Sequence, residues 1–146
     1  MRTSLEVLFT PAEFAALERR DLSNVLCVVF DVLRATADKL AVAENVILVC
    51  SGTFDQVAYE DTLAAGAMCD LLWPMHGSGA VSDSAHMARK LYHLEKDDLL
   101  AGISKSRNGR RLLANPDLKD DVAFCVQGDV YGLTAVLRDG ALSRND

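Results

Sequence analysis

Two apolar segments that each run directly into polar side chains constrain the fold of this chain most. They are residues 25–36, VLCVVFDVLRAT, and residues 46–66, VILVCSGTFDQVAYEDTLAAG. Each begins with a run of apolar residues that is typical of a buried β-strand. Ligands of open α/β folds bind beyond the carboxyl ends of the strands, so the polar residues after each run are candidate site residues. They are Asp31 and Arg34 in the first segment and Ser51, Thr53, Glu60 and Asp61 in the second.

The order of the predicted elements indicates an α/β fold. Strands are predicted over residues 5–9, 25–30, 45–50, 122–126 and 133–137, and helices over 11–20, 59–72, 82–94 and 97–114. We expect the 146 residues to form a single domain, a three-layer α/β/α sandwich with a mainly parallel or mixed sheet. The uniformly apolar strand at 25–30 is expected to be covered on both faces.

Local signals set the ends of several helices. Thr10, Pro11 and Glu13 form a capping box with proline at the first helical position, which predicts a helix start. Trp73 and Pro74 are expected to end the helix over 59–72, and residues 75–80 are expected to form a loop. The helical stretch over 97–114 is expected to break near Gly109.

Charge and cysteine usage exclude several classes of protein. The net charge of −6 and a pI near 5.0 argue against non-specific nucleic-acid binding, which needs a basic face. No apolar run is long enough for a membrane span, and the N-terminus lacks the apolar stretch of a signal peptide. The four cysteines form no CxxC pair, and Cys27, Cys50 and Cys125 fall in predicted buried strands. We therefore expect a reduced, cytoplasmic protein with no nucleic-acid or membrane partner.

Four charged residues are candidates for metal or anion chemistry, and each also has an ordinary structural explanation. Asp31, at a strand end, suits Mg²⁺ and equally suits a turn or helix cap. Arg34 suits bidentate binding of a phosphate or sulfonate, although a lone arginine is more often an ordinary surface residue. Glu60 and Asp61 are adjacent, so on a helix they point about 100° apart. One of them is a candidate metal ligand or general base, although acids in a first helical turn also favour the helix dipole.

Two further segments carry groups that suit an anion. Ser51, Gly52 and Thr53 follow a strand and offer hydroxyls and backbone N–H groups, but the segment lacks the lysine of a P-loop. The run SRNGRR begins at Ser106 and offers arginines around a glycine. Taken alone, the first segment is more often an ordinary turn, and a solvated helix face is the default explanation of the second.

Six stretches of this chain resemble the 2-phosphosulfolactate phosphatase family. They are VLFTPAEF at 7–14, VVFDVLRAT at 28–36, VILVCSGT at 46–53, YEDTLAAGA at 59–67, SRNGRRL at 106–112 and DVAFCVQGD at 121–129. The DVLRAT and EDTLAAG blocks are the specific ones. The resemblance implies Mg²⁺-dependent hydrolysis of 2-phosphosulfolactate to sulfolactate and phosphate, a reaction associated with coenzyme M biosynthesis. It implies Mg²⁺ binding and water activation by Asp31, Glu60 and Asp61, and contacts from Arg34, Ser51 and Ser106 to the small anionic substrate.

The chain departs from the family between about residues 37 and 45. The family has a long central region there, including a Thr-rich segment that ends in Asn-Gly-Thr, where this chain has only Asp38 to Glu44. Two hypotheses follow: an active phosphatase, or a non-catalytic remnant that acts through oligomerisation because missing strands leave sheet edges exposed. Convergence of Asp31, Arg34, Glu60 and Asp61 on one crevice would favour the phosphatase.

Overall fold

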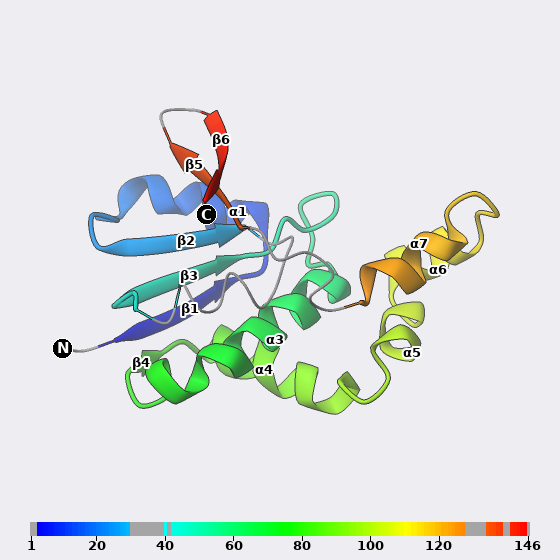
Figure 1. Ribbon diagram of the computed structural model, residues 1–146, viewed down its shortest axis with the longest axis horizontal. Coiled ribbons are helices and arrows are strands. Elements are labelled where there is room, and N and C mark those ends of the chain that lie inside the picture. The colour runs from blue at the N-terminus through cyan, green and yellow to red at the C-terminus, as the bar shows by residue number, and fades with distance from the viewer. Residues whose placement is uncertain (1–2, 30–39, 41, 128–133, 139–140, 146) are drawn as a thin grey trace.

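The computed structural model describes residues 3–29, 40, 42–127, 134–138 and 141–145 (Figure 1). The elements in chain order are β1 (Ser4–Leu8), α1 (Pro11–Ala15), the 3-10 helix η1 (Ala16–Arg19), β2 (Val25–Val29), β3 (Asn45–Val49), α3 (Tyr59–His76), β4 (Ala80–Val81), α4 (Asp83–Glu95), α5 (Leu99–Ser104), α6 (Arg107–Leu113), α7 (Lys119–Cys125), β5 (Thr134–Arg138) and β6 (Ala141–Asn145). Strands alternate with helices over most of this length, so the predicted α/β fold is confirmed.

The main sheet has four strands in the order β2-β3-β1-β4, and its described pairs are all parallel. Leu5 lies opposite Val46, and Val7 lies opposite Leu48, so these side chains share one face of the sheet. Parallel strands end at the same edge, and α3 begins beside that edge (Figure 1). The predicted site residues after β3 therefore lie at the carboxyl edge of the sheet.

Helices α3 and α4 cover one face of the sheet and form the main core with it. Side chains of β1 and β3 pack there against α3, whose Met68 and Leu72 are fully buried. The two helices cross closely at Gly66, because a Cβ on this residue would meet the Ala88 carbonyl and would lie 2.8 Å from the Tyr92 Cβ. This crossing explains why glycine occupies the middle of a long helix despite its poor helix propensity.

A charged cluster also joins α3 to α4. Asp70 accepts hydrogen bonds from Arg89 Nε at 2.8 Å and from His93 Nε2 at 2.7 Å. The Arg89 guanidinium lies 4.2 Å from the centre of the Trp73 ring, within cation–π range. Burial raises the pKa of Asp70, but the bonds from His93 and Arg89 outweigh it, so the pKa of this carboxyl is lower than usual.

The opposite face of the sheet is only partly covered. Leu17 of η1 packs there against Leu8, Ile47 and Val49. Strand β2 lies at the edge and pairs with β3 alone among the described strands, and Leu26 is 44% exposed. The expectation that this strand is covered on both faces was therefore wrong, because an apolar run does not reveal whether a strand lies inside a sheet or at its edge.

The predicted capping box at the start of α1 is confirmed, and α4 begins within one residue of its predicted start. The Thr10 side chain accepts from the Glu13 N–H, and Glu13 accepts from the Thr10 N–H, completing the capping box. Helix α4 begins after Ser82, whose hydroxyl accepts from the Ala85 N–H. Both bonds satisfy backbone donors that a helix leaves unpaired in its first turn.

Several predicted boundaries of helices and loops were wrong. Helix α3 continues through Pro74 to His76. Proline here removes one hydrogen bond near the end of the helix, and the buried His76 anchors the last turn through Nε2, 3.0 Å from the Ala43 carbonyl oxygen. Residues 80–81 form β4 rather than part of a loop. The helical stretch over 97–114 breaks between α5 and α6, since Ser106 caps α6 and Gly109 lies inside it.

The C-terminal prediction was partly wrong. Residues 122–125 belong to helix α7, because Val122 packs among helices instead of pairing with a strand, and Asp120 and Asp121 favour a helix start. The strand predicted over 133–137 is found as β5, but it pairs antiparallel with β6 outside the main sheet. Strand β6 was not predicted.

All four cysteines are free, but the expectation that Cys27, Cys50 and Cys125 lie in buried strands was wrong for two of them. Cys27 and Cys125 are exposed, and Cys125 lies on a helix. Cys50 and Cys69 are buried, and burial raises the pKa of each thiol to about 12. Among the residues that the structure describes, no helix is both long and apolar enough to cross a membrane.

Candidate functional site

The loop between β3 and α3 forms the centre of the candidate site. Its first residues are held by Asp61, whose Oδ2 accepts from the Ser51 hydroxyl at 3.1 Å and the Gly52 N–H at 2.8 Å. Gly52 has φ +70°, which glycine adopts without steric cost. Asp61 therefore ties the start of the loop to the first turn of α3.

The same loop contains a tight turn in a costly conformation. The backbones of Thr53 and Gln56 bond to each other at 2.9 and 3.1 Å. The two residues between them, Phe54 and Asp55, have φ of 52° and 59°, as in the turns that usually carry Asn or Gly. Phe54 is also 80% exposed, so burial of its ring does not compensate for the strain. Such strain persists where the surroundings hold a backbone in place.

Helix α6 supplies those surroundings. The Arg107 guanidinium donates to Gln56 Oε1 at 2.6 Å and to the Thr53 carbonyl oxygen at 3.4 Å. Asn108 Nδ2 donates to Thr53 Oγ1 at 2.7 Å and also to Glu60 Oε1. Two residues at the start of α6 therefore connect the strained turn to the first turn of α3.

Glu60 has one satisfied oxygen and one unsatisfied oxygen. Oε1 accepts from Asn108, whereas Oε2 is buried and has no hydrogen-bond partner among the residues that the structure describes. A buried, unpaired carboxylate oxygen is costly unless a cation or a donor meets it. As expected from their spacing, Glu60 and Asp61 contact different elements.

Ser106 is buried, and its hydroxyl accepts from the Gly109 N–H at 2.8 Å, so the structure gives it a capping role in α6. Its contact with an anion stays a prediction, as does that of Ser51. Asp31 and Arg34 lie outside the described residues. The predicted convergence of Asp31, Arg34, Glu60 and Asp61 therefore also stays a prediction.

The chemistry of Glu60 fits Mg²⁺, a hard cation that prefers oxygen ligands and keeps several waters. Asp61 fits less well, because its Oδ2 already accepts two hydrogen bonds. Within the described ranges, no group of three or more His, Cys, Asp or Glu residues could hold a metal ion. Asp31, the third acid of the predicted set, falls outside those ranges.

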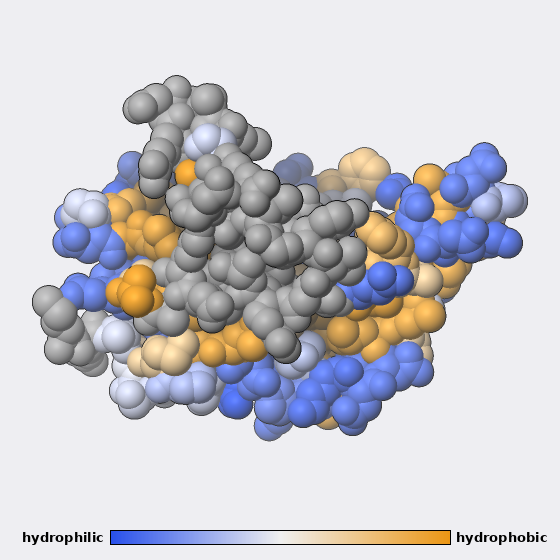
Figure 2. Space-filling view, in the orientation of Figure 1, coloured by the Kyte–Doolittle hydropathy of each residue, from blue (hydrophilic) through white to orange (hydrophobic). Residues whose placement is uncertain are grey.

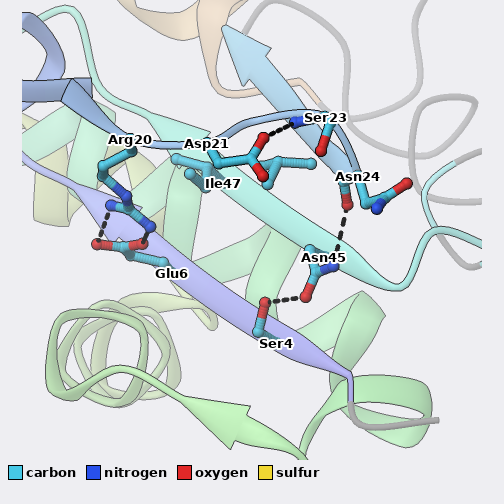
Figure 3. Close-up of a pocket in the computed structure, with 9 residues that line it drawn as sticks. Ser4, Glu6, Arg20, Asp21, Ser23, Asn24, Asn45 and Ile47 are labelled. Carbon is cyan, nitrogen blue, oxygen red and sulfur yellow. Dashed lines mark hydrogen bonds and ion pairs between the residues drawn. The ribbon is translucent and has the colours of Figure 1, made fainter. Parts of the chain in front are cut away.

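A pocket lies away from this loop, at the opposite edge of the sheet, where β1, β2 and β3 begin (Figure 3). Its volume is about 310 Å³. Arg20 and Glu6 form a bidentate ion pair across it, in which Nη1 donates to Oε1 at 3.1 Å and Nη2 donates to Oε2 at 2.8 Å. Asn45 accepts from the Ser4 hydroxyl and donates to the Asn24 carbonyl. These groups bond to one another, so the carboxyl edge of the sheet remains the better candidate site.

A parallel sheet with carboxylates and hydroxyls beyond its strand ends is the arrangement in which open α/β folds bind their ligands, so the fold defines the class of protein as α/β. Comparison with known proteins is more specific. The chain belongs to the 2-phosphosulpholactate phosphatase family, whose model matches residues 37–140. The matched range contains Ser51, Glu60, Asp61 and Ser106 and begins after Asp31 and Arg34. The family predicted from the sequence is thus confirmed.

Three relatives are each named probable 2-phosphosulfolactate phosphatase. The protein of Pseudothermotoga lettingae is 31% identical over 105 residues, 71% of this chain and 44% of the relative. That of Thermosynechococcus vestitus is 34% identical, covering 62% of this chain and 38% of the relative. That of Thermotoga maritima is 26% identical, covering 92% of this chain and 57% of the relative. This chain therefore spans about half the length of these curated relatives.

The sequence did not single out Asn108. It lies in the run SRNGRR, whose arginines were the predicted anion ligands. The structure instead shows the Asn108 amide donating to Glu60. The only sequence signal for it is its position at the start of a helix within a matched stretch.

Proposed function

We propose that this chain carries a phosphatase site that hydrolyses 2-phosphosulfolactate to sulfolactate and inorganic phosphate, in a Mg²⁺-dependent reaction of the kind used in coenzyme M biosynthesis. Membership of the family supports the reaction class. The single observation that carries the site is the buried Oε2 of Glu60 beyond the strand ends, to which no described residue donates a hydrogen bond. An oxygen in this position is suited to a cation that in turn binds a phosphate.

Each residue has a proposed role. Glu60 would hold Mg²⁺ through Oε2, with Asp31 and Asp61 as further ligands, and Asn108 fixes Glu60 through Oε1. When bound, Mg²⁺ would neutralise charge on the phosphate oxygens and make the attacking water more acidic. Arg34, Ser51 and Ser106 contact the anion.

In the reaction, a water oxygen bonds to phosphorus and the P–O bond to the sulfolactate oxygen breaks. The leaving oxygen takes up a proton, and inorganic phosphate is released. One carboxylate of the set Asp31, Glu60 and Asp61 accepts the proton of the attacking water.

The test is phosphate release from 2-phosphosulfolactate by the purified chain, with and without Mg²⁺. We expect Mg²⁺-dependent turnover that Asp31→Asn and Glu60→Gln each reduce at least a hundredfold, the usual scale for such groups. Glu18→Gln, an exposed acid on η1, is the matched control and should retain full activity. Absence of turnover in a folded protein, or full activity of Glu60→Gln, would contradict the proposal.

The proposed setting is the cytoplasm. Four free thiols, two of them exposed, are the pattern of a protein kept in a reducing compartment. The proposed partner is a small phosphate ester with further negative charge.

A second candidate function is assembly without catalysis. The observation that favours it is the edge strand β2, whose sequence VLCVV has no charged residue or proline to prevent pairing with another chain. Light scattering coupled to size exclusion tests it. A monomer at high micromolar concentration would reject assembly, whereas an oligomer that Leu26→Lys dissociates would support it.

A further inference from the structure

The strained turn of the loop between β3 and α3 is connected to both acids of the candidate site. Just before the turn, the Gly52 N–H donates to Asp61 at 2.8 Å. At its first residue, the Thr53 hydroxyl accepts from Asn108 at 2.7 Å, and the same Asn108 amide donates to Glu60. The positions of residues 52 and 53 are therefore coupled to Asp61 and to Glu60.

The sequence of the turn does not favour this position. Phe54 and Asp55 have φ of 52° and 59°, a conformation in which a bulky side chain is an outlier and Asn-Gly is the usual pair. The Gln56 carbonyl oxygen lies close to Gly52, since a Cβ on this glycine would be 2.7 Å from it. A turn that relaxed would therefore displace Gly52 together with Thr53.

Arg107 holds both ends of the turn from outside. Its guanidinium donates to Gln56 Oε1 at 2.6 Å and to the Thr53 carbonyl oxygen at 3.4 Å, and that oxygen also accepts from the Gln56 N–H. Both acceptors are neutral, although a guanidinium bonds most strongly to an anion. Figure 2 shows mostly hydrophilic side chains over the end of the molecule formed by α6 and α7, so water is an alternative partner for this exposed arginine. The two contacts join the ends of the turn to α6 and oppose its relaxation.

We propose that Arg107 is a positioning residue of the candidate site, which holds the strained turn so that Thr53 and Asn108 keep Glu60 in its orientation. The proposal rests on the proposed function and adds to it a residue that has no role there. It requires no contact between Arg107 and the substrate. A turn that is stable by itself should therefore make Arg107 dispensable.

Three variants test this relation. Arg107→Ala removes the hold on the turn. Phe54→Asn combined with Asp55→Gly, the relaxed-turn variant, supplies the pair that adopts positive φ at low cost. Arg19→Ala, at an exposed arginine of η1, is the matched control for the loss of an arginine. Urea unfolding of each variant confirms that the protein is folded.

The first arm measures the hold itself by limited proteolysis with chymotrypsin. Phe54 is 80% exposed, so cleavage after it requires only that the turn open. We expect Arg107→Ala to accelerate cleavage after Phe54 at least about tenfold, and Arg19→Ala to leave it unchanged. Cleavage after Trp73, inside α3, is the internal reference, because it reports general unfolding and should not accelerate.

The second arm follows the connection to Glu60 by NMR, without Mg²⁺ or substrate. The two Nδ2–H signals of Asn108 report on its bonds to Thr53 and Glu60. We expect Arg107→Ala to move both signals toward their positions in the urea-unfolded protein. The same change in the relaxed-turn background should leave them at their parent positions.

The third arm measures phosphate release from 2-phosphosulfolactate in the presence of Mg²⁺. Arg107→Ala should lower kcat at least about tenfold, because a misplaced group near the reacting atoms is costly. The KM should change by less than about twofold, since Arg107 does not bind the substrate. The relaxed-turn background should restore kcat, a rescue that an arginine in contact with substrate would not show.

The outcomes separate the proposal from the proposed function. Unchanged cleavage after Phe54 in Arg107→Ala, or unmoved Asn108 signals, would overturn the proposal whatever the activity. A raised KM that the relaxed-turn background does not restore would place Arg107 on the substrate, which overturns the proposal and leaves the proposed function intact. A parent without turnover that gives the expected results in the first two arms would reject the proposed function and support the hold of Arg107 on Glu60.

Discussion

Asn108 connects α6 to both the strained turn and Glu60, so its removal should weaken the whole candidate site. Asn108→Ala deletes a bond to the Thr53 hydroxyl and a bond to the Glu60 carboxylate. A neutral hydrogen bond contributes about 1 kcal/mol, and one to a charged group contributes about 1.5–3 kcal/mol. Since Glu60 is partly accessible to solvent, we take the low end and expect a loss of about 2 kcal/mol.

Urea unfolding followed by tryptophan fluorescence measures this loss. With a slope near 1.5 kcal/mol/M, the midpoint should fall by about 1.3 M. Asn24→Ala is the matched control, an exposed asparagine whose change should cost less than about 0.5 kcal/mol.

A double-mutant cycle with Glu60→Ala isolates the pair. We expect a coupling free energy above about 1 kcal/mol. If Asn108→Ala shifts the midpoint no more than Asn24→Ala, or if the two changes add within about 0.5 kcal/mol, Asn108 does not hold Glu60 and the reasoning fails.

Three further predictions concern the rest of the fold. Gly66→Ala should destabilise the protein by about 3 kcal/mol, because the new methyl group meets the Ala88 carbonyl; an unchanged thermal midpoint would refute this. In the native protein Ellman's reagent should modify only the exposed Cys27 and Cys125 within minutes, because burial raises the pKa of the Cys50 and Cys69 thiols to about 12. All four thiols should react in denaturant, and fast reaction of more than two in the native protein would refute this. Asp70 has a lowered pKa, so its stabilising effect is present above its unfolded pKa and lost as pH falls through the folded pKa. Asp70→Asn should therefore destabilise the protein at pH 7, and the urea midpoints of mutant and parent should converge as the pH falls below the lowered pKa of Asp70.

Local signals predicted the first half of the fold well. Strands β1 and β3 and the starts of α1, α3 and α4 were predicted to within a residue or two, because capping residues and apolar runs act over short distances. The errors came where tertiary contacts decide. Helix α3 continues past Pro74, where the buried His76 bonds to the Ala43 carbonyl. Val122 lies in helix α7 with its side chain buried, although the residues around it favour a strand.

The candidate site was predictable in position but not in its connections. The residues after β3 were expected at the carboxyl edge of the sheet, and Glu60 and Asp61 were expected to diverge. The bridge from Asn108 to Glu60 spans 48 residues of sequence, and no periodicity or capping rule relates residues so far apart. Asp31 and Arg34 remain predictions.

The strand order also sets the sequence of events as the chain is made. Of the described strands β1 comes first in the chain, yet its described neighbours in the sheet, β3 and β4, follow residue 44. Until then β1 and β2 are the only described strands available, and they are not adjacent in the finished sheet. Any early pairing between them must open to admit β3. Formation of this sheet is therefore a late, non-local step, and a nascent chain that stalls before β3 exposes two apolar strands at once.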